Sequence, residues 1–458
     1  MASEYQRVAA MPNTTSRVEG ATRTRRSTAR ARRDASRPPP AVIDRLLAAV
    51  DLEALVREGT AVRRVGDRFE GVCPFHSARS DDGHSLVLDL GAHRFDCAVC
   101  GFGGTAIGWL MYHDGFTFPE ALLELGRRTG IALDPRVSTD AVEASARDRD
   151  TFLADVAAAW HAELGAHRDA VRYLARRDIG RAMIERYGIG FAATDTRPID
   201  HGKRDRRRRL WQHGLMIRRD GNTFAPRFRE RVMFPIRDVR GAVIGFGGRT
   251  LDPAGRPKYL NSPSSARFDK GRVLYGLHEA LGTGSGVERL VIVEGYLDVI
   301  ALAGAGVGFA VATLGTAVTE RHLAEALAHT AHVTLCLDGD AAGRAAAVRA
   351  VEQALPLLTD EQVLDVVYLP PGDDPDSFVR VHGAEAFLSL LGLALPLEEV
   401  LLGTLAEGCD LDEIGGQARF GSRVLAHVDS ARSARLRQGL LDRASAAIGI
   451  TLGPAGSD

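Results

Sequence analysis

The amino-acid sequence predicts a multidomain α/β protein with a parallel sheet in its second half. Its 458 residues are enough for two or three domains, each with its own hydrophobic core. Short apolar runs at residues 290–293 and 333–337 alternate with helical patterns, which is typical of buried parallel strands. Three of the five cysteines fall within positions 73–100, which indicates a small metal-bound domain nearer the N-terminus.

The composition is that of a globular protein. Hydrophobic residues make up 45% of the chain, yet no long uncharged apolar run and no secretory signal is visible. The cysteines do not resemble a disulfide framework, so a reducing compartment is expected. We therefore expect a cytoplasmic protein without a membrane partner.

Charge is strongly segregated along the chain, although the net charge is only −1. Residues 201–272 contain 19 Lys and Arg against six acidic residues, and residues 1–40 contain nine Arg against three acidic residues. A basic segment in a chain that also carries acidic metal ligands favours phosphates held between cations and metal ions. A solvated charged surface is the alternative interpretation.

Cysteine and histidine spacing predicts a zinc site. Cys73-Pro-Phe-His76 and Cys97-Ala-Val-Cys100 each place two soft or borderline ligands two residues apart. Four such ligands suit a closed tetrahedral site, so the zinc ion would be structural rather than catalytic. Three reduced core cysteines beside a chance histidine are the alternative, less favoured interpretation.

Local patterns predict the elements around this site. Residues 43–56 have the apolar spacing of a helix, residues 67–72 resemble a strand, and residues 105–129 resemble two helices joined by a turn. The polar stretch 133–150 is predicted to be a linker. Two helices are then expected over residues 152–187.

The basic segment contains a predicted pair of strands. Residues 231–236 and 242–246 are largely apolar and flank a turn at residues 238–241. The glycine-rich loop 245–248 fits neither the Walker pattern nor the dinucleotide fingerprint, and no Walker sequence occurs elsewhere. These observations exclude an ATP-driven motor of the Walker class.

Acidic residues follow three apolar runs, two of them named above and the third at residues 363–369. In parallel sheets the carboxyl ends of the strands meet at one edge, where ligands bind. Carboxylates gathered there would repel one another unless a divalent cation neutralised them, and Mg²⁺ suits such hard oxygen ligands. The candidate metal ligands are Glu294, Asp338, Asp340, Asp374 and Asp376.

The last part of the chain is predicted to be helical. No cluster of charge and no motif that carries chemistry occurs after residue 384. The predicted helices cover residues 388–402, 417–427 and 433–448.

These sequences, in this order, resemble the DnaG-type primases of bacteria and phages over roughly residues 42–450. The cysteine and histidine pairs are similar to the zinc ribbon of that family, and residues 229–263 to the basic half of its RNA-polymerase domain. Glu-Gly-Tyr-Leu-Asp at 294–298, Asp-Gly-Asp-Ala-Ala-Gly at 338–343 and Asp-Pro-Asp at 374–376 resemble its TOPRIM half. The helicase-binding domain of the family is not evident.

The resemblance implies a domain order and a C-terminal helical subdomain beside the α/β sheet. The expected segments are a disordered basic tail (1–40), a zinc-binding domain (41–132), a linker (133–150), the basic half of the RNA-polymerase domain (151–284), the TOPRIM subdomain (285–382), a helical subdomain (383–450) and a tail (451–458).

The resemblance also implies a DNA primase, which copies a single-stranded DNA template into short RNA primers from NTPs with Mg²⁺ or Mn²⁺. Glu294, Asp338 and Asp340 would be catalytic, and Glu294 is either a metal ligand or the general base. The template backbone is expected at residues 204–209, and a replicative helicase is a candidate partner. Triphosphate contacts are expected from Arg249, Lys258, Asn261, Lys270 and Arg231.

Two other functions remain as alternatives. A TOPRIM topoisomerase or nuclease shares the carboxylates, but strand passage needs a nucleophilic Tyr in a large additional domain, and neither activity explains the basic segment. A non-catalytic, zinc-dependent single-strand binder explains the zinc site and the basic segment but leaves the acidic residues without a role.

Within the zinc domain, Arg94, Phe95 and Phe102 could contact single-stranded bases, or the Phe side chains could pack beneath the ribbon.

Overall fold

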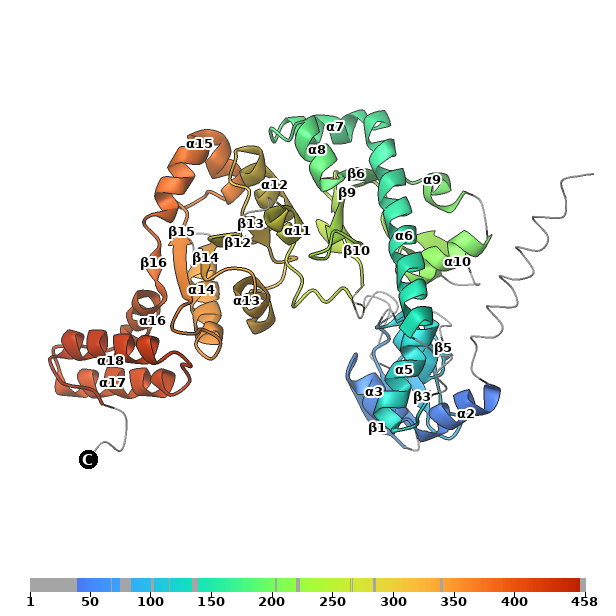
Figure 1. Cartoon of the computed structure of the whole chain (residues 1–458), viewed down its shortest axis with the longest axis horizontal. Helices are drawn as coiled ribbons and strands as arrows, with labels where there is room; N and C mark the ends of the chain where they lie inside the picture. The colour runs from blue at the N-terminus through green and yellow to red at the C-terminus, as the bar shows by residue number, and fades with distance from the viewer. Residues whose placement is uncertain are drawn as a thin grey trace, which may run out of the picture.

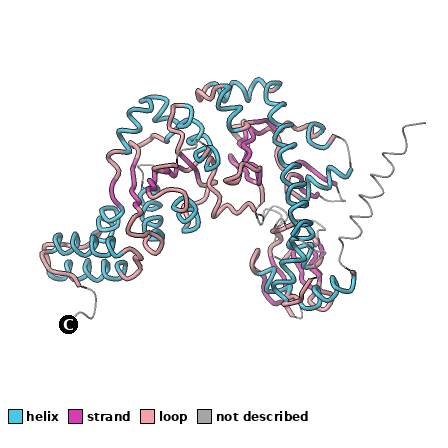
Figure 2. Tube along the Cα trace, in the orientation of Figure 1, coloured by secondary structure: helices cyan, strands magenta, loops and turns pink. Residues whose placement is uncertain are grey.

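The computed structural model has four parts, with the zinc-binding region at one end and a helical pair, α17 (Ile414–Val428) and α18 (Ala434–Ile448), at the other (Figures 1 and 2). None of the helices in the described chain is both long and apolar enough to cross a membrane. The structure describes residues 39–66, 68–74, 84–99, 103–114, 116–133, 139–201, 204–219, 223–263, 265, 267–282, 286–337 and 341–453.

The zinc-binding region is an antiparallel sheet in the order β1-β2-β3-β4-β5 that packs against helices. The helix expected over residues 43–56 is in fact two helices, because Asp51 begins a new one by accepting a hydrogen bond from the Ala54 amide at 2.9 Å. The elements are α2 (Pro40–Ala49), α3 (Leu52–Arg57), β1 (Val62–Val65), β2 (Arg68–Gly71), β3 (Leu86–Asp89), β4 (Arg94–Cys97), β5 (Gly103–Gly104), α4 (Ala106–Tyr112) and α5 (Phe118–Thr129).

Helix α6 (Thr139–Glu163) occupies most of the stretch predicted to be a linker, so this stretch is helical over residues 139–150. The helix runs from the zinc-binding region along the basic half of the molecule (Figure 1). Arg149, which is buried in this stretch, donates to Glu120 of α5 at 3.0 Å. Tertiary ion pairing therefore orders a segment whose polar sequence looked like a linker.

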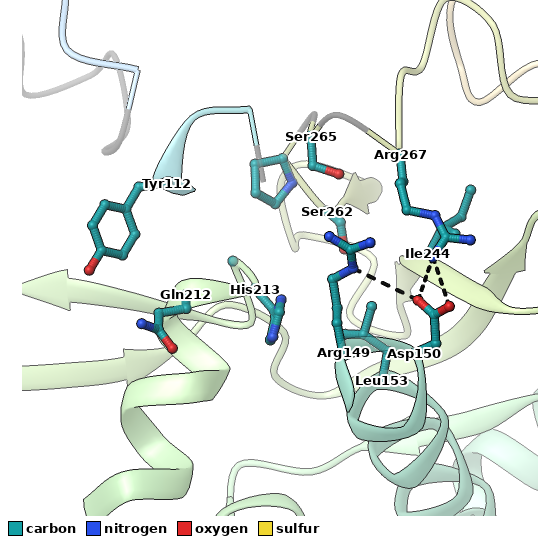
Figure 3. Close-up of a pocket in the computed structure, with 12 residues that line it drawn as sticks. Tyr112, Arg149, Asp150, Leu153, Gln212, His213, Ile244, Ser262, Ser265 and Arg267 are labelled. Atoms are coloured by element: carbon teal, nitrogen blue, oxygen red, sulfur yellow. Dashed lines mark hydrogen bonds and ion pairs between the residues drawn. The ribbon is translucent and has the colours of Figure 1, made fainter. Parts of the chain in front are cut away.

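An interface of aromatic contacts and ion pairs, called the seam below, joins α6 and the zinc-binding region to the basic half. Trp211 packs against the cores of both parts, and its ring lies 4.6 Å from that of Tyr112. Figure 3 shows a cavity at this seam, where Arg149 and Arg267 both reach Asp150. Arg267 donates to Asp150 at 2.6 Å, and the cavity measures only about 40 Å³.

His213 lines this cavity and should make the fold sensitive to acid. Burial, together with Arg149 and Arg209, lowers the pKa of His213 from 6.5 to about 3. Below pH 6.5 the unfolded chain therefore binds a proton that the folded chain does not, so stability falls as the pH falls. We expect the Tm of His213→Gln to fall less than the Tm of the wild type when the pH is lowered from 7 to 5.

Thermal unfolding monitored by circular dichroism at several pH values measures this difference. His382→Gln, at an exposed position on another helix, is the matched control and should keep the wild-type dependence. Parallel Tm profiles for the wild type and His213→Gln would contradict the prediction.

The basic half contains an antiparallel sheet in the order β11-β10-β9-β6. The predicted strand pair is confirmed, because β9 and β10 are antiparallel across the turn at 238–241. Residues 152–187, predicted to form two helices, contain the end of α6 and two further α-helices, α7 and α8. The further elements are η2 (Leu164–Ala166), α7 (Arg168–Ala175), α8 (Arg181–Tyr187), β6 (Gly190–Ala192), α9 (Arg197–Asp200), α10 (Arg204–Gln212), β7 (Met216–Arg219), β8 (Thr223–Pro226), β9 (Arg231–Arg237), β10 (Val243–Thr250), β11 (Tyr259–Asn261) and α11 (Leu277–Leu281).

The second large sheet has the order β13-β12-β14-β15-β16 and is parallel except for the edge strand β16. The predicted parallel α/β architecture is confirmed. Alternate residues of β12 enter two different cores: α12 and α15 cover one face, and α13, α14 and α16 cover the other. The elements are β12 (Leu290–Val293), α12 (Tyr296–Gly304), β13 (Ala310–Ala312), α13 (Glu320–Leu327), β14 (His332–Leu337), α14 (Ala341–Ala354), β15 (Val363–Tyr368) and α15 (Pro375–Leu391).

The two sheets share one hydrophobic core. Phe234 of β9 stacks on Tyr296 of α12 with ring centroids 5.2 Å apart, and Tyr275 meets the same ring edge-on at 4.7 Å. Val291 and Val293 of β12 belong to this cluster too. The basic half and the parallel-sheet half are therefore packed together as one unit.

The C-terminal part is helical, as predicted, but the helix expected over residues 388–402 is interrupted. Helix α15 ends at Leu391, and residues 395–396 pair with the edge of the parallel sheet before α16 begins. The remaining elements are β16 (Leu395–Pro396), α16 (Leu397–Ala406), α17 (Ile414–Val428) and α18 (Ala434–Ile448).

Candidate active site

A cavity of about 600 Å³ opens at the carboxyl ends of β12 and β14, where the parallel sheet faces the basic half. Three acidic side chains line it from the parallel-sheet half, and Arg177, Arg249 and Lys258 line it from the basic half. Anionic and cationic groups therefore face one space. The acidic residues are Glu294, Asp298 and Asp374.

Glu294 and Asp298 lie at the junction of β12 and α12. Glu294 is exposed and directly follows the buried strand, as predicted. Asp298 is half-buried, and its carboxylate accepts a hydrogen bond from the Gly295 amide at 3.0 Å. Burial, reinforced by Asp374 and Asp376, raises the pKa of Asp298 to about 8.

Asp298 was not among the predicted ligands. Its signal was present in the sequence, because Asp298 lies four residues after Glu294, in the first turn of the helix that begins after Gly295. That spacing returns a carboxylate toward the strand end from which the helix starts. The raised pKa indicates a carboxylate that would gain from a nearby cation.

Asp374 and Asp376 occupy different environments although they are only two residues apart. Asp374 is exposed and caps α15, where it accepts a hydrogen bond from the Ser377 amide at 2.7 Å. Asp376 is 1% exposed and forms ion pairs with Arg177 and Arg380. Only Asp374 of the two lines the cavity.

Asp338 and Asp340 lie outside the described residues, immediately after β14. Within the described part of the chain, no three His, Cys, Asp or Glu side chains lie close enough together to hold a metal ion. The carboxylates that line the cavity nevertheless have the chemistry of hard oxygen ligands for a divalent cation. Strand β14, which precedes these two residues in the sequence, ends beside this cavity, and its Cys336 and Leu337 line it.

Arg249 is held between two tyrosine rings. Its guanidinium carbon lies 5.1 Å from the ring centroid of Tyr173 and 5.0 Å from that of Tyr259. This stacking fixes a planar cation at the cavity wall. Lys258, next to Tyr259, is exposed on the same wall.

The other predicted triphosphate contacts lie elsewhere. Arg231 is buried and donates to the carbonyl groups of Gly248, Lys258 and Pro257 at 3.0, 3.3 and 2.9 Å. It therefore braces the backbone of β10 and the loop before β11.

Asn261 and Lys270 are likewise absent from the residues that line this cavity. Asn261 donates to the Leu314 carbonyl at 2.8 Å and accepts from the Tyr296 hydroxyl at 2.6 Å, so it joins the two halves. Burial and Arg227 lower the pKa of Lys270.

Two of the four predicted zinc ligands are described. Cys73 and Cys97 are 1% and 3% exposed within the core of the zinc-binding region, while His76 and Cys100 lie outside the described residues. Two buried sulfur ligands fit a closed structural zinc site. Phe95 is fully buried and meets Trp109 edge-on at 5.1 Å, so it packs beneath the sheet and does not contact bases.

The arginines at residues 204–209 lie on α10, and several are paired within the protein. Arg207 donates to Asp200 at 2.7 Å, and Arg209 donates to Asp148 at 2.8 Å. Arg208 is exposed on the same helix. Much of this tract therefore stabilises the packing of α10.

Three protein-family models match this chain. The CHC2 zinc finger matches residues 39–141, the N-terminal domain of the DNA primase catalytic core matches residues 159–281, and the Toprim-like family matches residues 291–379. The zinc-finger match implies a structural zinc ion, and the Toprim match implies a divalent metal.

Individual proteins give the same result. The DNA primase of Pasteurella multocida is 36% identical over 421 residues, which cover 90% of this chain and 72% of that protein. A DnaG primase catalytic domain bound to ssDNA is 40% identical with a TM-score of 0.62, covering 66% of this chain and 98% of that structure. The zinc-binding and RNA-polymerase domains of the Aquifex aeolicus primase are 28% identical with a TM-score of 0.59, covering 90% and 98%. With its zinc-ribbon, basic and Toprim parts in the same order, the chain belongs to the DnaG-type DNA primases, the nucleotidyltransferases that make RNA primers in DNA replication.

Proposed function

We propose that the cavity between the two sheets is the site of nucleotidyl transfer and that its carboxylates hold Mg²⁺ or Mn²⁺. The observation that carries this proposal is that three carboxylates of the parallel-sheet half and three cations of the basic half, Arg177, Arg249 and Lys258, line one space. The proposed metal ligands are Glu294, Asp298 and Asp374, with Asp338 and Asp340, which follow β14 in the sequence.

Primer extension requires attack of a 3′-hydroxyl on the α-phosphorus of an NTP. Bound divalent metals neutralise charge on the attacking and leaving oxygens of such a reaction. Glu294, exposed at the end of β12, is either one of their ligands or the base that accepts the hydroxyl proton. Arg249 and Lys258 would hold the triphosphate and stabilise pyrophosphate as it leaves.

The template in this proposal is single-stranded DNA. The similarity to a primase catalytic domain that was solved with ssDNA supports this assignment. Arg208, exposed on α10, is the member of the predicted template tract that we assign to the DNA backbone. Arg231 and Asn261 are reassigned from the triphosphate to positioning roles, because their polar groups bind protein atoms. A helicase partner remains a prediction.

The full chain, supplied with single-stranded DNA, labelled NTPs and Mg²⁺ or Mn²⁺, should produce short RNA. Electrophoresis of the labelled products measures this activity, and reactions without template or without metal should give none. Cleavage or relaxation of DNA without any RNA product would contradict the proposal and favour a nuclease or topoisomerase.

Arg249→Ala should lower kcat/KM for NTPs about 10²-fold, because it removes a fixed cation from the wall that faces the triphosphate. Initial rates of primer extension at varied NTP concentration measure the effect. Arg240→Ala, at the exposed turn between β9 and β10, is the matched control and should behave as the wild type. An unchanged kcat/KM for Arg249→Ala would remove this residue from the proposed site.

A further inference from the structure

Asp376 is enclosed at the start of α15, although its sequence position suggested a metal ligand. Its side chain is 1% exposed. One carboxylate oxygen, Oδ2, pairs with Nη1 of Arg177, and the other, Oδ1, accepts from Nε of Arg380 at 2.9 Å. Both oxygens of Asp376 are therefore bound by guanidinium groups.

Arg177 comes from the other half of the molecule, in the turn after α7. It lines the cavity, and its guanidinium carbon lies 5.3 Å from the ring centroid of Tyr173. The same Tyr173 ring stacks with Arg249. A continuous row of contacts thus leads from Asp376, through Arg177 and Tyr173, to the cation proposed to hold the triphosphate.

Asp376 also reaches the acidic side of the cavity through its backbone. The backbone of Asp376 lies close enough to the carboxylate of Asp298 to lower its pKa, and the Gly295 amide donates to the same carboxylate at 3.0 Å. Asp376 therefore pairs with Arg177 of one wall and lies beside Asp298 of the other. Its own carboxylate could bind a metal only by leaving two guanidinium groups without their partner, one of them 26% exposed and the other 31%.

We infer that Asp376 is a positioning residue: with Arg177 it forms a clasp between the two halves that sets Arg249 opposite the metal-binding carboxylates. This inference rests on the proposed metal site and refines it, because it moves Asp376 out of the ligand set. The clasp joins residues 199 positions apart in the sequence.

The clasp and the ligand hypothesis predict different responses to metal. In Asp376→Asn and in Arg177→Gln, the Mg²⁺ concentration for half-maximal primer synthesis should stay within about twofold of the wild type. The KM for NTPs should rise about tenfold in each, and the double variant should be no worse than either single one, because coupled residues are not additive. Arg177→Lys keeps the positive charge but loses the planar group that stacks on Tyr173. Its KM for NTPs should therefore lie between those of the wild type and Arg177→Gln.

Asp374→Asn is the control, because Asp374 is a proposed ligand two residues away; it should raise the Mg²⁺ midpoint at least tenfold. If the Mg²⁺ midpoint of Asp374→Asn equals that of the wild type, the proposed metal site is wrong. The clasp is tested separately, by the KM values of the Asp376 and Arg177 variants and by whether their effects add in the double variant. The inference is overturned if Asp376→Asn raises the Mg²⁺ midpoint tenfold and Arg177→Gln does not, or if the two KM effects are additive. Should either single variant be too unstable to assay, recovery of Tm in the double variant would support the clasp, and its absence would refute it.

Discussion

Glu294→Gln should lower the rate of primer synthesis about 10²- to 10⁴-fold, the range expected for loss of a catalytic carboxylate. Glu294 ends a buried strand and is exposed at the cavity, so the substitution removes a charge without disturbing the core. Extension rates at saturating template and NTP measure the loss. Glu288→Gln, the same change at an exposed position before the same strand, is the matched control and should retain activity.

The metal dependence of the Glu294→Gln variant separates the two roles proposed for this residue. If Glu294 is a metal ligand, higher Mn²⁺ concentration should restore part of the rate, because the site is weakened and not destroyed. If it is the base, activity should instead rise with pH at every metal concentration. A variant with wild-type rates would show that the reaction centre lies elsewhere.

Cys97→Ser should unfold the zinc-binding region while the catalytic half stays folded. Structural zinc contributes about 10–16 kcal/mol of apparent binding free energy in small zinc domains, and that energy is also folding energy. Cys97 is 3% exposed between strands and the helices behind them, so its loss also leaves a polar hydroxyl in a core position. Limited proteolysis should cut within residues 39–133 and spare residues 150–450.

Cys409→Ser, at a half-buried cysteine in the C-terminal helical part, is the matched control and should keep the wild-type proteolysis pattern. Zinc content measured by atomic absorption should fall in Cys97→Ser alone. Full zinc content and an unchanged digest for Cys97→Ser would contradict the predicted ligand set.

The parallel strands and the acids after them could be predicted because both signals are local. Residues 290–293 and 333–337 are buried on both faces, which leaves a continuous apolar run in the sequence. Glu294 follows directly, so its place at the strand end needed no tertiary information. The paired strands around residues 238–241 were predictable for the same reason.

Features that depend on distant partners could not be read from the sequence. The sequence of residues 139–150 resembles a linker, but in the fold Arg149 pairs with Glu120. Asp376 resembles a metal ligand, but in the fold it pairs with Arg177. Arg231 lies in a basic segment, yet its donors bind backbone carbonyls. In each case a charged side chain, expected to be solvated in a sequence-based prediction, finds its hydrogen-bond or ion-pair partners only in the folded chain.

The core shared by the two sheets has a consequence for how the enzyme selects substrates. Many polymerising and phosphoryl-transfer enzymes test a nucleotide by swinging one domain onto another, which needs a hinge and an interface that can part. Here Tyr296 stacks on Phe234 across the two halves, and separating them would expose that core to water. We therefore expect packing to fix the distance between the cations and the carboxylates, so that discrimination among nucleotides would depend on base pairing with the template.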